Sequence, residues 1–489
     1  MAGQHRPLDE EGGARRVAPI TRRTFCRSAL LGLAGLTSQR VFAAASAPRP
    51  NILLITADDL GPYLGCYGDS IARTSNLDRL AAEGVRFERA FVTHASCSPS
   101  RSSIFTGLYP HQNGQIGLAH LGYSMREGMR TLPALLEQAG YRTGVIGKIH
   151  VAPDSAFPFD WKGGLKVADT RDVRLVAERA GDFMSQSAGP FFLMANYFDP
   201  HRPLAHQVKG VPQQPFASDG IKPFPFLGLD TPQIREEVAG YYNCAARFDV
   251  GVGMLLDRLA QAGHGENTIV IVLGDHGPPF TRAKTTCYEA GLHIPLIVRW
   301  PGRAKAGLAS GALVSTVDIL PTVLDGAGIE LPAPIAGRSL VPLLRGKDVP
   351  WRESLCAEYT SHGPRNFYPR RSIRDARHKL ILNLLPDRPN PVLGVDGCAA
   401  WAASRDPDLD GTMMRGVYDT YHHPSAVELY DLDNDPNEFH NLAGRPEHAA
   451  VENRLRRQLE QWREETNDPL VDPEALAALT REHDALPTK

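Results

Sequence analysis

Short apolar runs alternate with amphipathic segments through the first two thirds of the chain. Apolar runs of strand length without polar alternation are typical of strands buried on both faces of a sheet. They predict strands over residues 51–56, 142–147, 191–195, 268–273 and 295–300. Apolar residues at helical spacing predict helices over 74–84, 131–140, 171–187, 231–262 and 316–326. This alternation predicts an α/β domain with a large, mostly parallel sheet sandwiched by helices.

The pattern changes after a stretch rich in proline and glycine at residues 342–351. Segments 371–374, 379–384 and 428–432 have the composition of antiparallel strands, and a helix over 447–465 is predicted as the last element. We therefore expect a smaller C-terminal α+β subdomain built on an antiparallel sheet. The expected division is 48–345 for the α/β domain and 346–489 for the subdomain.

The N-terminus has the features of a targeting segment. Arg22 and Arg23 precede an apolar stretch at 29–36, and small residues follow at 42–47. This order is typical of a twin-arginine export signal, which predicts a signal segment over 1–47 and a periplasmic or secreted protein. A disordered basic leader is the alternative. The apolar stretch is too short for a stable membrane span, and we expect no span elsewhere.

Composition excludes some classes of partner. The 489 residues include 53 Lys and Arg against 55 Asp and Glu, a formal net charge of −2, so no electrostatic case exists for nucleic acid. An anionic substrate would have to be bound by a few placed cations. The seven cysteines form no metal-finger spacing, and Cys26 would leave with the signal segment. One disulfide among the others is possible, but no pairing follows from the spacing.

Acidic side chains follow two of the predicted strands. The first strand ends in Asp58-Asp59, and the strand over 268–273 is followed by Asp275-His276. Carboxyl ends of parallel strands meet at one sheet edge, where ligands bind. Three carboxylates there would repel one another without a cation, and such oxygen-rich donors favour Ca²⁺, with Mg²⁺ or Mn²⁺ possible. Either pair alone would more often be a solvated strand end.

Residues 94–107 place Cys97 at the start of a predicted short helix, with Pro99 and Arg101 behind it. Proline suits the first helical turn. The free N–H groups and the positive dipole end of that turn favour an anion and acidify a thiol. The alternative is an ordinary buried cysteine.

Further cationic or imidazole side chains follow other strands. Lys148 and His150 come after the strand over 142–147, His201 after the strand over 191–195, and Lys284 precedes the strand at 295–300. Each alone would more often be a surface or hydrogen-bonded residue. Together they are expected at the same sheet edge as the acidic pairs.

The sequence Cys97-x-Pro99-Ser100-Arg101 resembles the signature of type I sulfatases, within the alkaline phosphatase superfamily. The strand-end motifs at Asp58-Asp59, Lys148-x-His150, His201 and Lys284 resemble the family's further site motifs, in its order. The resemblance spans the chain after the signal segment and implies an alkaline phosphatase-like fold. The pair Asp275-His276 stands where some members carry Asp-Asn, and Lys284 where some carry arginine.

The resemblance implies that Cys97 is converted to formylglycine by a formylglycine-generating enzyme. One hydroxyl of the hydrated aldehyde would attack sulfur, and the second would allow sulfate to be expelled. It also implies that Asp58, Asp59, Asp275, His276 and residue 97 hold the metal. Arg101, Lys148 and Lys284 would stabilise charge on the transferring group, His150 would orient or deprotonate the nucleophile, and His201 would protonate the leaving group.

The expected function is therefore hydrolysis of a sulfate ester or sulfamate of a sulfated carbohydrate, with an N-sulfated glucosamine as one candidate. A phosphonate monoester or phosphodiester hydrolase of the same superfamily is the alternative enzyme. A catalytically silent, exported carbohydrate-binding protein is the alternative outside enzymes, and an unmodified Cys97 would mark it.

Overall fold

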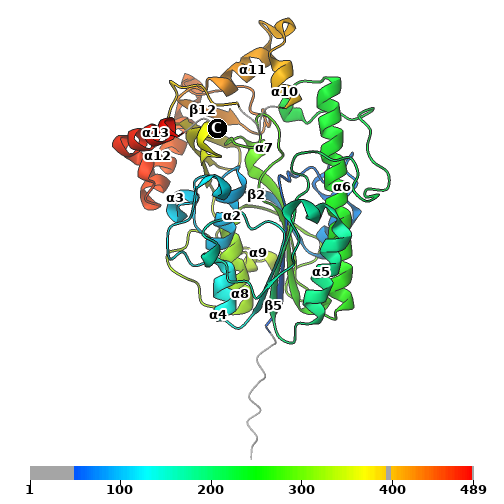
Figure 1. The fold of residues 1–489 in the computed structure, drawn as a ribbon. Coiled ribbons are helices and arrows are strands. Elements are labelled where there is room, and N and C mark those ends of the chain that lie inside the picture. The colour runs from blue at the N-terminus through cyan, green and yellow to red at the C-terminus, as the bar shows by residue number, and fades with distance from the viewer. Residues whose placement is uncertain (1–48, 393–397, 487–489) are drawn as a thin grey trace, which may run out of the picture. The chain divides into compact units, whose positions relative to one another are not determined.

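The computed structural model describes residues 49–392 and 398–486. The expected export signal over 1–47 lies outside the described residues. An eight-stranded mixed sheet runs through the core, in the order β4-β3-β5-β1-β6-β7-β2-β8 (Figure 1). Its strands are β1 (Asn51–Ala57), β2 (Val85–Phe91), β3 (Arg142–Ile146), β4 (Trp161–Lys162), β5 (Phe191–Tyr197), β6 (Thr268–Gly274), β7 (His293–Arg299) and β8 (Leu308–Ser315).

The helices lie on both faces of this sheet and in the C-terminal part (Figure 1). Those in the first part are α1 (Ser75–Glu83), α2 (Cys97–Thr106), α3 (Pro110–Asn113), α4 (Leu132–Gln138), α5 (Val173–Ser185), α6 (Pro232–Gln261), α7 (Glu289–Leu292), α8 (Ile319–Ala327) and α9 (Val341–Leu344). Those in the C-terminal part are α10 (Ala399–Ser404), α11 (Met413–His422), α12 (Ala449–Glu465) and α13 (Pro473–Ala485).

Strand β1 is buried along its whole length because helices cover both of its faces. Ile52 and Leu54 pack into a cluster with residues of α2, α4 and α8. The alternate residues Leu53 and Ile55 pack into a second cluster with residues of α1, α5 and α6. Side chains of a strand alternate between its faces, so an unbroken apolar run is needed to fill both clusters. The prediction of a mostly parallel sheet sandwiched by helices is confirmed.

Three strands of this sheet, β2, β4 and β8, are absent from the sequence-based expectation, and β4 spans only two residues. Strand β2 carries half-buried or exposed arginine and glutamate among its apolar residues, and β8 is half exposed at the sheet edge, so neither forms an apolar run. Strand β7 pairs antiparallel with both β6 and β2, which makes the sheet mixed.

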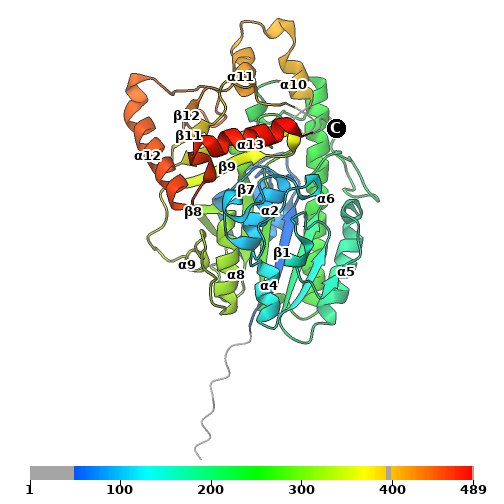
Figure 2. The same cartoon turned by 60° about the vertical axis from the view of Figure 1, so that its left-hand side comes forward.

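The C-terminal part contains a separate antiparallel sheet in the order β12-β11-β10-β9, as expected. Its strands are β9 (Leu355–Ser361), β10 (Phe367–Arg374), β11 (His378–Asn383) and β12 (Val427–Asp431). Leu455 and Leu459 of α12 pack on this sheet. The prediction that the helix over 447–465 is the last element is wrong, because α13 follows it and crosses in front of β9 in Figure 2. Strand β9 was also not predicted from the sequence, because its buried Glu358 interrupts the apolar pattern.

No helix within the described ranges has the length and apolar character needed to cross a membrane. The six described cysteines are all free, and five of them are buried. Cys97 is one of these free cysteines, so its thiol is not tied up in a disulfide.

Candidate active site

The register of the parallel strands brings the acidic pairs together at one edge of the large sheet. Ala57 at the end of β1 lies opposite both Tyr197 of β5 and Gly274 of β6. The next residues therefore meet: the backbone N–H of Asp275 donates to the carbonyl of Ala57 at 3.0 Å. Because all three strands end at the same level, their following side chains line one site.

Two consecutive aspartates reach the same site because the backbone turns between them. Asp59 has a φ of 68°, the left-handed conformation that non-glycine residues rarely adopt. Its backbone N–H donates to Asp275 Oδ1 at 2.9 Å. Oxygen atoms of Asp58, Asp59 and Asp275 consequently lie within 4.8 Å of one another, all three residues being fully buried. The expected meeting of the two acidic motifs is confirmed.

Three permanent cations surround these carboxylates. Lys148 Nζ lies 2.6 Å from Asp58 Oδ2, and Lys284 Nζ lies 2.8 and 3.0 Å from the two oxygens of Asp59. Burial alone would lower the pKa of each lysine, but the adjacent carboxylate raises it, so both remain charged.

Arg101 of α2 is the most deeply embedded cation, since its side chain is fully buried. Its Nε donates to Asp275 Oδ2 at 2.9 Å, and its Nη2 lies 3.3 Å from Asp58 Oδ1. Its Nη1 donates to the Lys148 carbonyl at 3.1 Å and to Asn196 Oδ1 at 3.2 Å. The guanidinium thereby ties the first turns of α2 to the ends of β1, β3, β5 and β6.

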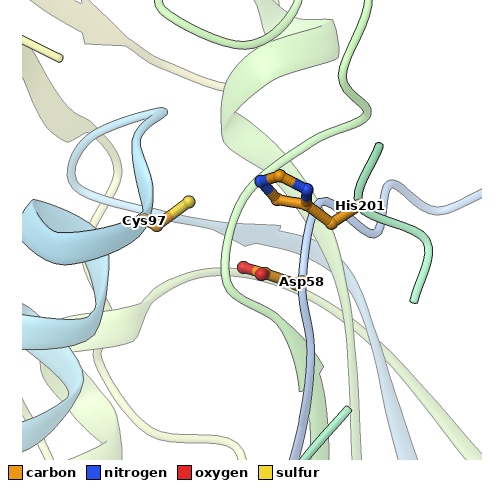
Figure 3. A group of neighbouring side chains, drawn as sticks. All are labelled: Asp58, Cys97 and His201. Carbon is orange, nitrogen blue, oxygen red and sulfur yellow. The ribbon is translucent and has the colours of Figure 1, made fainter. Parts of the chain in front are cut away.

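Cys97 is the first residue of α2 and is buried with its thiol facing the carboxylates. Its Sγ lies 3.4 Å from His276 Nε2. Figure 3 shows the thiol, the His201 ring and the Asp58 carboxylate pointing toward a common centre. Burial alone would raise the pKa of this thiol, but Lys148 and Lys284 hold it well below its ordinary value. The structure thus places the thiol beside cations that favour its ionised form, in agreement with the electrostatic expectation for this helix start.

Two other histidines complete the set expected from the sequence. A ring nitrogen of His201, the Cys97 thiol and an Asp58 oxygen lie within 4.8 Å of one another, and His201 Nδ1 bonds the Arg202 carbonyl at 2.6 Å. His150 is half-buried. Burial lowers its pKa below the ordinary value, although the Cys97 side chain acts in the opposite direction. All sequence-predicted residues thus gather at this sheet edge.

The site includes residues that sequence reasoning missed. His362, which follows β9, places Nδ1 2.8 Å from the hydroxyl of Ser96, the residue before Cys97. Burial and the positive charge of Lys284 hold the pKa of His362 well below its ordinary value. His120 bonds His150. Neither histidine stands in a recognisable motif, so only the folded chain reveals them.

The donor set fits a hard divalent cation. Three buried carboxylates converge within 4.8 Å, and carboxylate oxygens are the ligands that Ca²⁺ and Mg²⁺ prefer. His276 Nε2 lies 3.0 Å from Asp59 Oδ1. Burial disfavours its charged form, but Asp275 and Asp59 raise the pKa of His276 to about 10. Burial and the nearby Asp58 raise the pKa of Asp275 to about 7, so the cluster favours additional positive charge.

Family models match most of the chain. The model described as Sulfatase matches residues 50–329, more than half of the chain and including all of the site residues named from the sequence. A second model, N-sulphoglucosamine sulphohydrolase, C-terminal, matches residues 274–386. This range includes β7 and β8 of the large sheet and β9, β10 and β11 of the antiparallel sheet.

Individual relatives agree with these models. Human N-sulphoglucosamine sulphohydrolase is 34% identical over 460 residues, covering 86% of this chain and 91% of its own. An ulvan-active sulfatase of Formosa agariphila is 31% identical and covers 88% of this chain and 83% of its own. The solved phosphonate monoester hydrolase of Agrobacterium radiobacter shares the fold, with a TM-score of 0.64, 20% identity and coverage of 86% of this chain and 96% of that chain. The chain belongs to the sulfatase family.

Proposed function

We propose that this enzyme hydrolyses a sulfate ester or sulfamate of a sulfated carbohydrate. The observation that carries the proposal is the placement of Cys97 at a helix N-terminus, facing three buried carboxylates and two lysines. A tetrahedral sulfuryl group bound there would meet positive charge from several sides, which favours the extra charge of its transition state.

The proposed nucleophile is formylglycine at position 97, made from the cysteine by a formylglycine-generating enzyme. Its hydrated aldehyde supplies one hydroxyl that attacks sulfur and a second whose deprotonation releases sulfate. A cysteine or serine could not release sulfate in this way without an external water. The N-terminal position in α2 and the low thiol pKa support a role in chemistry for this residue rather than simple packing.

The proposed metal is Ca²⁺, with Mg²⁺ or Mn²⁺ as alternatives, held by Asp58, Asp59, Asp275, His276 and residue 97. When bound, it would lower the pKa of the nucleophilic hydroxyl and polarise the sulfate oxygens. Arg101 would hold Asp58 and Asp275 in place through its hydrogen bonds to both.

The remaining side chains have distinct proposed tasks. Lys148 and Lys284 would bind sulfate oxygens once substrate enters, because their ammonium groups lie beside the carboxylate cluster. His150 would orient the nucleophile or take its proton. His201 would give a proton to the departing oxygen or nitrogen of the sugar, since its ring faces the reaction centre from the side opposite Cys97 (Figure 3).

The proposed substrate is an N-sulfated glucosamine of heparan type. The C-terminal family model and the human relative both bear the name N-sulphoglucosamine sulphohydrolase, which supports this choice. The ulvan-active relative makes an O-sulfated sugar the competing substrate. A phosphonate monoester remains the alternative because a hydrolase of that type shares the fold. Sequence relatives above 30% identity favour the sulfatase.

We also propose export by the twin-arginine route to the periplasm or beyond. That route carries folded proteins, so residue 97 could be modified and the metal bound before export. The start of the second sheet at Leu355, in β9, supports our proposed domain division at 345/346.

Mass spectrometry of the peptide that contains residue 97 tests the central step. We expect a species lighter than the cysteine form, as aldehyde replaces thiol. A side-by-side assay should then show hydrolysis of a sulfamate or sugar O-sulfate in preference to a phenylphosphonate ester. Cys97→Ala should abolish turnover, while the matched variant Cys66→Ala should not, since Cys66 lies in a short turn after β1 and burial raises its pKa to about 12. An unmodified Cys97 would favour the silent binding protein, and preference for the phosphonate would contradict the sulfatase.

A further inference from the structure

A second histidine contacts His150 at the rim of the site. His120 Nδ1 and His150 Nε2 are 2.7 Å apart, a hydrogen-bonding distance. The two rings are stacked, with centroids 4.9 Å apart and an interplanar angle of 20°. His120 is exposed, whereas His150 is half-buried. The pair therefore extends from solvent toward the interior of the site, where His150 Nδ1 is buried.

The position of His120 is set by both parts of the protein. It lies in a short 3₁₀ turn, Ala119–Leu121. The backbone N–H of Ala119 donates to Ser98 Oγ at 3.0 Å, one residue after Cys97 in α2. The backbone N–H of Leu118 donates to the carbonyl of His362 at 3.0 Å. Hydrogen bonds to α2 and to the residue after β9 both fix this turn. They therefore hold the imidazole of His120 against the ring of His150.

The inner nitrogen of His150 is the one available for chemistry. His150 Nδ1 is buried and, apart from the nearby Cys97 side chain, has no hydrogen-bond partner. Its backbone adopts a left-handed φ of 57°, which directs the residue out of the extended segment after β3. The Cys97 side chain is near enough to raise the pKa of His150 against the larger effect of burial.

When both rings are neutral, the bond between the two imidazoles decides which nitrogen of each ring carries hydrogen. One nitrogen must donate and the other must accept. If His120 donated, the hydrogen of His150 would sit on Nδ1 and face residue 97. A nitrogen in that state cannot take a proton from a nucleophilic hydroxyl. If His120 accepts, His150 keeps its hydrogen on Nε2, and Nδ1 presents a lone pair to residue 97.

We propose that His120 is a positioning residue that accepts the Nε2 hydrogen of His150 and thereby holds Nδ1 of His150 as a hydrogen-bond acceptor toward residue 97. His120 keeps its own hydrogen on Nε2, where solvent can accept the bond. This inference rests on the proposed function for its catalytic consequence, because the lone pair is useful only to a hydroxyl that must lose a proton. The tautomer itself is a property of the resting enzyme.

Three variants test the role in turnover. His120→Leu removes the acceptor, whereas His120→Asn can present a side-chain oxygen in place of Nδ1. Leu121→Ala, on the adjacent exposed residue of the same turn, controls for disturbance of the loop. Hydrogen-bond partners that orient metal-bound histidines typically contribute about 10- to 100-fold to activity. Because His120 would orient His150 in the same way, we expect kcat of His120→Leu to fall by a similar factor. KM should stay within about two-fold, and His120→Asn should regain most of the lost kcat.

Nuclear magnetic resonance of enzyme labelled with ¹⁵N in its histidines tests the tautomer without any turnover. The signals of His150 are identified by their loss in His150→Gln. In the wild type and in Leu121→Ala we expect hydrogen on Nε2 and a bare Nδ1. In His120→Leu we expect a mixture of the two tautomers.

The outcomes separate this inference from the proposed function. A protonated Nδ1 in the wild type, or an unchanged kcat in His120→Leu, would overturn the inference. A raised KM with unchanged kcat would also overturn it, since His120 would then be a substrate contact. Absence of sulfate and sulfamate hydrolysis in the wild type would refute the proposed function instead, and the resonance result would still decide the tautomer.

Discussion

Asp468 provides a test of how buried charge stabilises the C-terminal part of the fold. Its carboxylate accepts from Arg371 Nε and Nη2, both at 2.8 Å, and from Arg463 Nε at 2.8 Å. It also accepts from the backbone N–H of Leu470 at 3.1 Å. The side chain is fully buried. Asp468→Asn removes the negative charge and leaves the two guanidinium groups without it.

The expected loss follows from burial. Removing one partner of a buried ion pair costs about 3–5 kcal/mol when the remaining charge stays desolvated and unpaired. Arg371 keeps a second carboxylate, Glu358 Oε2 at 3.4 Å, so we expect Asp468→Asn to fall at the lower end of that range. Asp484 offers a matched control, since it accepts from Arg388 Nη1 and Nη2 at 2.8 Å each, but its side chain is 53% exposed. Asp484→Asn should cost no more than about 1 kcal/mol, because water screens and solvates the exposed pair.

Urea unfolding, followed by tryptophan fluorescence, measures both variants. Trp462 is adjacent to Arg463 and packs edge-on against Tyr109, so its emission reports on this region. The slope of the free energy against urea should be unchanged, with only the midpoint shifted. The two variants remove ion pairs of similar geometry but different burial. If both lost the same free energy of unfolding, burial would not be what sets the size of the loss, and the reasoning would be refuted.

The pH dependence gives a second check on the same variant. Burial alone would raise the pKa of Asp468, but Arg371 and Arg463 hold it below its ordinary value. A carboxyl with a lowered pKa in the folded state stabilises the fold above its unfolded pKa of about 4 and loses that effect as the pH falls further. The difference between wild type and Asp468→Asn should therefore persist from about pH 5 upward and shrink in stronger acid.

Three further predictions concern the site and its support. Treatment with a chelator, or Asp275→Asn, should lower turnover by more than about 100-fold, and metal analysis should show that only the wild type regains both metal and activity on adding Ca²⁺. Lys284→Met should lower kcat by about 10²- to 10³-fold if its charge stabilises the transferring group, and an unchanged kcat would exclude that role. Asp249 accepts from the backbone N–H of Leu77 at 2.8 Å in the first turn of α1, so Asp249→Ala should cost about 0.5–2 kcal/mol in urea unfolding. Burial raises the pKa of Asp249 to about 6, so its contribution is present in acid and weakens as the pH rises through that value; a loss larger at about pH 8 than at about pH 5 would contradict this.

Much of the fold was predictable because its main signals are local. The apolar runs of β1, β5 and β6 each fill both faces of a sheet, and that requirement is visible within seven residues. Strands β2, β8 and β9 were not predictable in this way. Their polar residues are accommodated by exposure at the edge or by partners elsewhere in the chain, as with Glu358 and His111.

By itself, the sequence determined which residue types stand at the strand ends and at the start of α2. The Cys97 motif and the acidic pairs follow from order and spacing along the chain, so their membership of one site could be predicted. Only the tertiary structure decided their partners. Ser96 and His362 meet across 266 residues, and Lys284 meets Asp59 across 225. The His120–His150 pair joins two segments that share no periodicity, because its bond depends on a turn anchored by α2 and β9. Contacts of this kind depend on packing between distant segments, which leaves no pattern in the local sequence.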